Sequence, residues 1–228
     1  MKTNTLRFAL LPLLALSALP LMPSACAQGT VSLPLSTSYK AQYTLDGSLA
    51  GVIAIPVGNP AQIPGYGQIN IQVYSAAVGT ASPFTAFGAG FIPSAWTASS
   101  TTPLHQIIGA AGLTPLTTFS LTGVAGGANA EVMVVGWTGD YPDWNTAYTA
   151  YPDHMVMLAR SGDILSGGAL AWVNGTGNPG GSPPSPPVAL VTGALGYNGL
   201  VFYRIPEPST FALAGLGAAM LMIFRRRK

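Results

Sequence analysis

The chain has 228 residues, of which 49% are hydrophobic and only 7% are charged. Most basic residues lie at its two ends, and the stretch between holds three basic residues against six acidic ones: Lys40, Arg160 and Arg204 against Asp46, Glu131, Asp140, Asp143, Asp153 and Asp163. Nucleic-acid binding depends on clustered Lys and Arg that neutralise phosphates, so this composition argues against nucleic acid as a partner.

Residues 1–27 have the layout of a secretory signal peptide. A short basic stretch precedes an apolar run over 8–22, and Ala25 and Ala27 then provide the small side chains of a cleavage site. We expect signal peptidase to cut after Ala27, so that Gln28 becomes the first residue of an exported protein.

The alternative is a lipoprotein in which Cys26 is acylated. Pro23 stands three residues before it, where such a signal carries an aliphatic side chain, and this favours ordinary cleavage. Cys26 is the one cysteine of the chain, so after cleavage behind Ala27 the protein has no disulfide to stabilise it.

The body, residues 28–204, is predicted to be a single all-β domain. Its Gly and Pro residues are spread throughout, while residues that favour helices are scarce. Short apolar runs alternate with turn signals such as Asp46-Gly47 and Asn198-Gly199. This pattern predicts one antiparallel β-sandwich or jelly roll.

Two segments give the clearest strand predictions. Residues 67–74 alternate apolar side chains with amides, which predicts a half-buried antiparallel strand. Residues 131–137 contain an unbroken apolar run and are predicted to form a central strand buried on both faces. The other predicted strands are 38–45, 49–57, 116–124, 154–159, 169–173, 188–192 and 200–205.

Two stretches are predicted to be loops. Residues 174–187 combine Gly with proline pairs, which excludes a helix or a central strand. Residues 140–153 are irregular and bring aromatic rings close to carboxylates, an arrangement with which many β-sandwiches hold sugars. The candidate glycan-binding residues are Tyr141, Asp143, Trp144, Tyr148 and Asp153. The alternative is that these rings only cover one end of the sandwich.

The body offers little for catalysis or metal binding. His105 and His154 lack the spacing of a zinc site, and Glu131 is the sole glutamate of the body available to a carboxylate pair. The aspartates of the 140–153 loop lack the pattern of a calcium loop, which favours solvated turn aspartates. We therefore expect no catalytic residues, no metal and no cofactor.

The C-terminus reads as a membrane anchor. Pro206, Glu207 and Pro208 precede an apolar run, which we predict to be a transmembrane helix over 210–224. The basic tail that follows is expected to stay in the cytoplasm, so that the body lies outside. Its members are Arg225, Arg226, Arg227 and Lys228. The apolar run itself, residues 211–224, has 14 residues and is about 21 Å long as a helix, which makes a marginal anchor.

These three parts, in this order, resemble the PEP-CTERM sorting signal of exported bacterial proteins, here over about 204–228, with the sorting signal itself taken as 205–228. The resemblance implies a transient anchor in the inner membrane, processing by an exosortase near the Pro-Glu-Pro motif, and delivery to the cell surface or the extracellular matrix. We therefore expect a non-catalytic structural or adhesive protein associated with exopolysaccharide. The alternative is a carbohydrate-binding or carbohydrate-processing domain that uses the 140–153 loop.

Overall fold

A computed structural model describes residues 28–33, 40–58, 61–85, 89–100, 118–151 and 156–204, and the backbone of 104–105. The predicted signal peptide and nearly all of the sorting signal lie outside this range, as do Asp153 and His154. Among the described residues, no helix is long and apolar enough to cross a membrane, and the predicted span over 210–224 is not among them.

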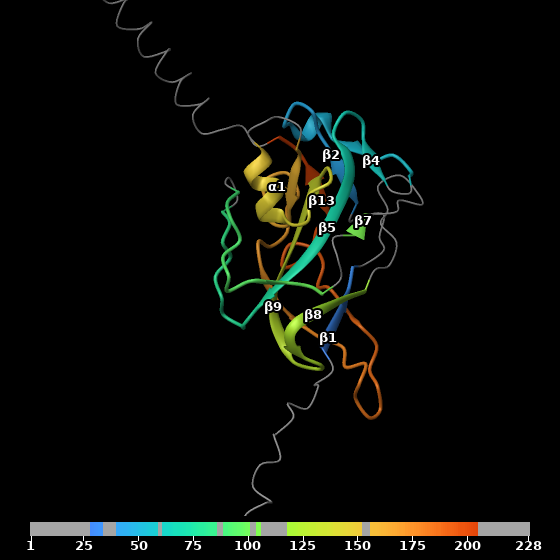
Figure 1. Ribbon diagram of the computed structural model, residues 1–228, viewed down its shortest axis with the longest axis vertical. Helices are drawn as coiled ribbons and strands as arrows, with labels where there is room; N and C mark the ends of the chain where they lie inside the picture. Colours follow the sequence, from blue (N-terminus) through green and yellow to red (C-terminus); the bar gives the residue numbers. More distant parts are fainter. Residues whose placement is uncertain are drawn as a thin grey trace, which may run out of the picture.

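Two long antiparallel strands form the centre of the body, β5 (Gly67–Ala76) and β9 (Asn129–Thr138). They cross the middle of the molecule in Figure 1, and their register runs from Ile69 opposite Thr138 to Ala76 opposite Glu131. Shorter strands extend this sheet on both sides: β4 (Gln62–Ile63), β6 (Thr97–Ala98) and β7 (Leu104–His105) pair with β5, and β10 (Leu158–Arg160) and β11 (Trp172–Gly175) pair with β9.

Two three-stranded sheets complete the described β-structure. One has the order β12-β1-β8, with β1 (Gln28–Ser32), β8 (Thr118–Ala125) and β12 (Val188–Ala189). The other has the order β13-β2-β3, with β2 (Ala41–Tyr43), β3 (Ile53–Ala54) and β13 (Leu200–Phe202). The prediction of a body built mainly from β-strands is confirmed. The predicted antiparallel sandwich is corrected in one respect: β12 pairs with β1 and β13 with β2 in parallel.

Two segments differ from their predictions for local reasons. The predicted strand over 49–57 begins instead with a 3-10 helix, η1 (Leu49–Gly51), because the hydroxyl of Ser48 accepts from the Gly51 N–H. The predicted loop over 140–153 contains a short helix, α1 (Trp144–Ala150), which Asp143 caps. The N-terminal strand β1 was not predicted.

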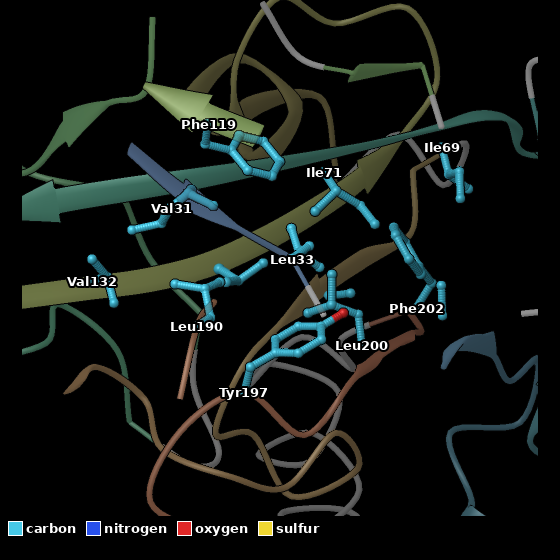
Figure 2. Close-up of a cluster of buried hydrophobic side chains, with 14 of the residues drawn as sticks. Val31, Leu33, Ile69, Ile71, Phe119, Val132, Leu190, Tyr197, Leu200 and Phe202 are labelled. Carbon is cyan, nitrogen blue, oxygen red and sulfur yellow. The ribbon is translucent and has the colours of Figure 1, made fainter. Parts of the chain in front are cut away.

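The central sheet is buried on both faces. On one face, apolar residues of β5 and β9 pack against the two smaller sheets, and Figure 2 shows Ile69, Ile71 and Val132 in one buried cluster with side chains from β1, β8 and β13. On the other face, a second apolar cluster includes α1 and the segment around Trp96. The arrangement is layered and sandwich-like.

This second layer corrects the prediction that β5 is half-buried. Asn70 is fully buried and Gln72 is 4% exposed, although both lie on the amide face of the strand. Their side-chain N–H groups are paired with backbone carbonyls, Asn70 with Gly139 at 2.8 Å and Gln72 with Ser99 at 3.4 Å. These amides therefore hold loops over the sheet instead of facing water. Their bonded N–H groups offset part of the free-energy cost of burial, although the side-chain oxygen of Gln72 has no partner among the described residues.

A glycine in the middle of β9 brings the third sheet close. A Cβ atom at Gly136 would lie 2.7 Å from the ring of Phe202 in β13, closer than real Cβ contacts. The missing side chain lets that ring pack directly against the β9 backbone, which explains a glycine inside a buried strand. The contact fixes the end of β13, and with it the point at which the chain leaves the body.

Candidate functional site

The site predicted over 140–153 is built on α1. Asp143 has an extended backbone, and its carboxylate accepts from the Thr146 N–H at 2.8 Å and from the Thr146 hydroxyl. An aspartate in this position accepts a hydrogen bond from a free backbone N–H of the first turn. Its negative charge also interacts favourably with the positive N-terminal end of the helix dipole. Asp143 is thus engaged in starting the helix. Below it, burial and the charge of Asp143 raise the pKa of Tyr74 to about 12.

Trp144 has a structural position. Its side chain is fully buried, and its indole N–H donates to the carbonyl of Gly90 at 2.8 Å. Its ring lies against that of Phe84, with 5.4 Å between the ring centroids. Because a sugar ring stacks only on an accessible aromatic face, Trp144 anchors α1 to the sheet and offers no such face in this structure.

A shallow hollow of about 490 Å³ lies on the outer side of α1. Its most accessible ring is Phe91, which is 60% exposed and packs edge-on against Tyr148 at 5.1 Å between centroids. Tyr148 in turn lies parallel to Tyr151, 6.5 Å away. The residues that line the hollow are Phe91, Tyr141, Asn145, Thr146, Thr149 and Ala150.

The segment that carries Phe91 is held to α1 by a side-chain amide. Asn145 accepts from the Ile92 N–H at 2.7 Å and donates to the Ile92 carbonyl at 3.0 Å. This pair of bonds fixes the ring of Phe91 beside the helix. The hydroxyl of Thr149 donates to the Asn145 carbonyl at 2.9 Å, which leaves its oxygen able to accept from a ligand.

The structure therefore brings together only part of the predicted set. Tyr141 and Tyr148 lie at or beside the hollow, Trp144 and Asp143 support it from within, and Asp153 is outside the described residues. Phe91 was missed, because it lies more than 50 residues before α1 and no local pattern connects the two.

Among the described residues, Glu131 and Asp140 do not form a close carboxylate pair. Glu131 accepts from the Gly79 N–H at 3.2 Å, near the start of β9. Thr138, which precedes Asp140, is seven residues farther along β9, about 24 Å away at the rise of an antiparallel strand. The two carboxylates of glycosidases are about 5–9.5 Å apart. Within the described part of the chain there is also no group of three metal-binding side chains.

A buried charged cluster supports the site from below. Arg160 is 1% exposed, donates to the Thr85 carbonyl at 2.8 Å and lies over the ring of Phe84 at 5.6 Å. Phe84 is the ring that packs on Trp144. Arg160 thus connects β10 to α1 through Phe84, and a guanidinium over an aromatic face is a favourable contact.

Asp163 and Tyr203 complete this cluster. The carboxylate of Asp163 accepts from the N–H groups of Leu165 and Ser166, yet burial raises its pKa above the ordinary value in spite of those bonds and of Arg160. Burial and the charge of Asp163 raise the pKa of Tyr203 to about 12, while a hydrogen bond with Arg160 acts in the opposite direction.

The chain ends in a segment that defines a class of exported proteins with a C-terminal sorting signal. Residues 204–228 match the PEP-CTERM protein-sorting motif, and this confirms the resemblance found in the sequence. The motif marks the chain as an exported protein that exosortase processes. Comparisons of the chain with curated proteins and with solved structures found no match.

Asp163 is expected to make stability depend on pH. Because its pKa is raised in the folded protein, the native state keeps a proton that the unfolded chain has already lost, so the free energy of unfolding falls as pH rises from about 3.8 through the folded pKa. In Asp163→Asn this contribution is absent. Urea denaturation of both proteins between about pH 3 and pH 7 measures it. A difference between them that does not change with pH would contradict the assignment.

Two buried tyrosines are expected to respond oppositely to loss of the hydroxyl. Tyr197 lies among apolar side chains (Figure 2), and its hydroxyl has no hydrogen-bond partner among the described residues. Tyr197→Phe is therefore expected to leave the free energy of unfolding unchanged or raise it by about 1 kcal/mol. Tyr203→Phe removes a hydroxyl beside the buried Arg160 and is expected to cost about 1–3 kcal/mol. Urea denaturation near neutral pH compares the two, and equal losses would refute the distinction.

Proposed function

We propose that the body is a non-catalytic adhesive domain that associates with extracellular polysaccharide through the hollow beside α1. The exposed ring of Phe91 carries this proposal, because a large aromatic side chain that is 60% exposed beside a hollow is available to stack on a sugar. We propose exopolysaccharide as the partner because the chain carries an exosortase sorting signal.

The chemistry of the hollow suits a neutral glycan. Its rings supply apolar faces for the C–H groups of a sugar, and the hydroxyls of Thr146 and Thr149 can accept from sugar hydroxyls. Several of these polar groups already bond within the protein, so each contact with a chain of sugars is expected to be weak. Many repeated contacts along a polysaccharide would compensate for weak individual binding, as multivalent attachment does.

Processing at both ends forms part of the same proposal. Signal peptidase would cut after Ala27, the apolar run over 210–224 would hold the protein transiently in the inner membrane, and exosortase would release it to the cell surface or matrix. The C-terminal boundary of the fold supports this order, because β13 ends at Phe202, just before the sorting motif at 204.

Intact-mass measurement of the protein from its own host tests the processing. Protein recovered from medium or matrix is expected to begin at Gln28 and to end near Pro206, because both the signal peptide and the C-terminal sorting signal have been removed. The matched sample is the inner-membrane fraction, where a precursor that still ends at Lys228 is expected in small amount. A chain confined to that membrane with Lys228 intact would overturn the proposal.

Stacking by Phe91 is tested with purified protein and the exopolysaccharide of the host in affinity electrophoresis. Phe91→Ala is expected to weaken retention about threefold to tenfold, because an aromatic contact contributes about 0.5–1.5 kcal/mol beyond the area it buries. Phe91→Tyr keeps the ring and is expected to retain binding. Val78→Ala changes an exposed apolar residue at the other end of β5 and serves as the control. Equal retention by all four proteins would contradict the proposed site.

A further inference from the structure

A second exposed apolar surface lies between β2 and β3. It consists of three large side chains, which we call the β2–β3 patch: Leu45, Leu49 and Ile53. They are 60%, 64% and 48% exposed, respectively. Single exposed apolar residues are common on protein surfaces, but three in one short connection suit a surface that meets another apolar phase.

Strand register places this patch where the chain leaves the body. Strands β2 and β13 are parallel, with Tyr43 opposite Phe202, and the Thr44 N–H donates to the Phe202 carbonyl at 2.9 Å. Parallel strands end at the same edge of a sheet, so Leu45 and Arg204 emerge side by side. Ile53 lies on the next strand, opposite Tyr43. The sorting motif therefore begins beside the patch.

The length of the connecting segment limits how far the patch can lie from a membrane. Five residues separate Arg204 from the start of the predicted span at 210, and the six steps of a fully extended chain across them reach only about 20 Å. While the anchor is inserted, this end of the body must stay close to the bilayer surface. Figure 1 shows β2 and β4 at one end of the long axis and β1 and β8 at the other, so the body has a distinct membrane-proximal end.

We propose that the β2–β3 patch lies in the interface of the membrane while the C-terminal anchor is in place, and leaves it when exosortase cuts the anchor. The proposal rests on the transient anchoring set out above and adds an orientation and a second contact to it. Apolar side chains that enter the boundary between headgroups and acyl chains lie about 5–10 Å deep, which a surface loop of this size can reach.

The charges beside the patch are compatible with this contact. Asp46 lies within it, and its carboxylate already accepts from the Thr44 hydroxyl at 2.7 Å and from the Ser48 N–H at 2.9 Å. These internal bonds replace part of the water that the carboxylate would lose near lipid. Arg204 is exposed at the same edge and adds a positive charge, which favours anionic headgroups.

Fluorescence quenching by lipid in vesicles tests the contact with the full-length chain. The protein is reconstituted into phosphatidylethanolamine and phosphatidylglycerol vesicles, with Cys26→Ser as background and one environment-sensitive label on Leu49→Cys or Val78→Cys. Both native residues are more than half exposed, so neither change is expected to disturb folding. Val78 is the matched control. Tyr203, Leu158, Trp137 and Asn70 form one paired row across the strands. The end of β5 at Ala76 lies six residues beyond Asn70, about 20 Å at strand rise, and Val78 lies in the turn that follows.

Nitroxide-bearing lipids are expected to quench the label at position 49 about twofold or more and to leave the label at 78 nearly unchanged, since only the first lies at interfacial depth. Resistance to alkaline extraction shows separately whether the chain is inserted. An inserted chain with no lipid quenching at 49 would overturn the membrane contact and leave the anchoring proposal intact. If the label at 49 is shielded from both lipid and aqueous quenchers, the patch is covered by a second copy of the chain or by the chain's own apolar run, and the membrane contact is overturned. A chain that alkali extracts would overturn both proposals.

Discussion

The pairing of β5 with β9 is the interaction on which the rest of this structure depends. These two strands supply apolar side chains to both clusters of buried residues, so every other described layer packs against one of their faces. Since the chain expected after signal cleavage has no cysteine, its stability has to come from this burial and from the hydrogen bonds around it. The short strands at the edges are too small to be stable alone and gain their stability from this central pair.

Buried polar groups decide where the irregular segments lie. Asn70 and Gln72 hold loop carbonyls over the sheet, and Asn145 holds the segment around Ile92 to α1. Arg160 acts in the same way at longer range, through Thr85 and Phe84. Because the body has few charged residues, side-chain amides and one guanidinium hold its loops in place, a role that ion pairs can have in more highly charged proteins. The consequence is a rigid frame beneath the ring of Phe91, which is the most accessible part of the candidate site.

In the proposals above, the two surfaces act at different stages of export. The β2–β3 patch lies beside the point at which the sorting motif begins, and we propose that it contacts the membrane only while the anchor is present. The hollow beside α1 is lined by residues of the body alone, so it would remain after the proposed processing of both ends. The proposed glycan contact therefore uses no residue of the signal peptide or of the sorting signal. The low charge of the body suits a hydrated, neutral polysaccharide better than an ionic partner.

The sequence by itself determined what is encoded locally. The sorting motif is recognised from the order of a few adjacent residues, and β5 and β9 follow from alternation and from an unbroken apolar run, because side-chain periodicity is a local property. Only the tertiary structure decided what depends on distant partners. It paired β1 with β12 and β2 with β13 in parallel, buried the amide face of β5, turned Trp144 inward and brought Phe91 to α1. In each case the outcome depended on which distant segment covered a face, and no pattern within one segment carries that information.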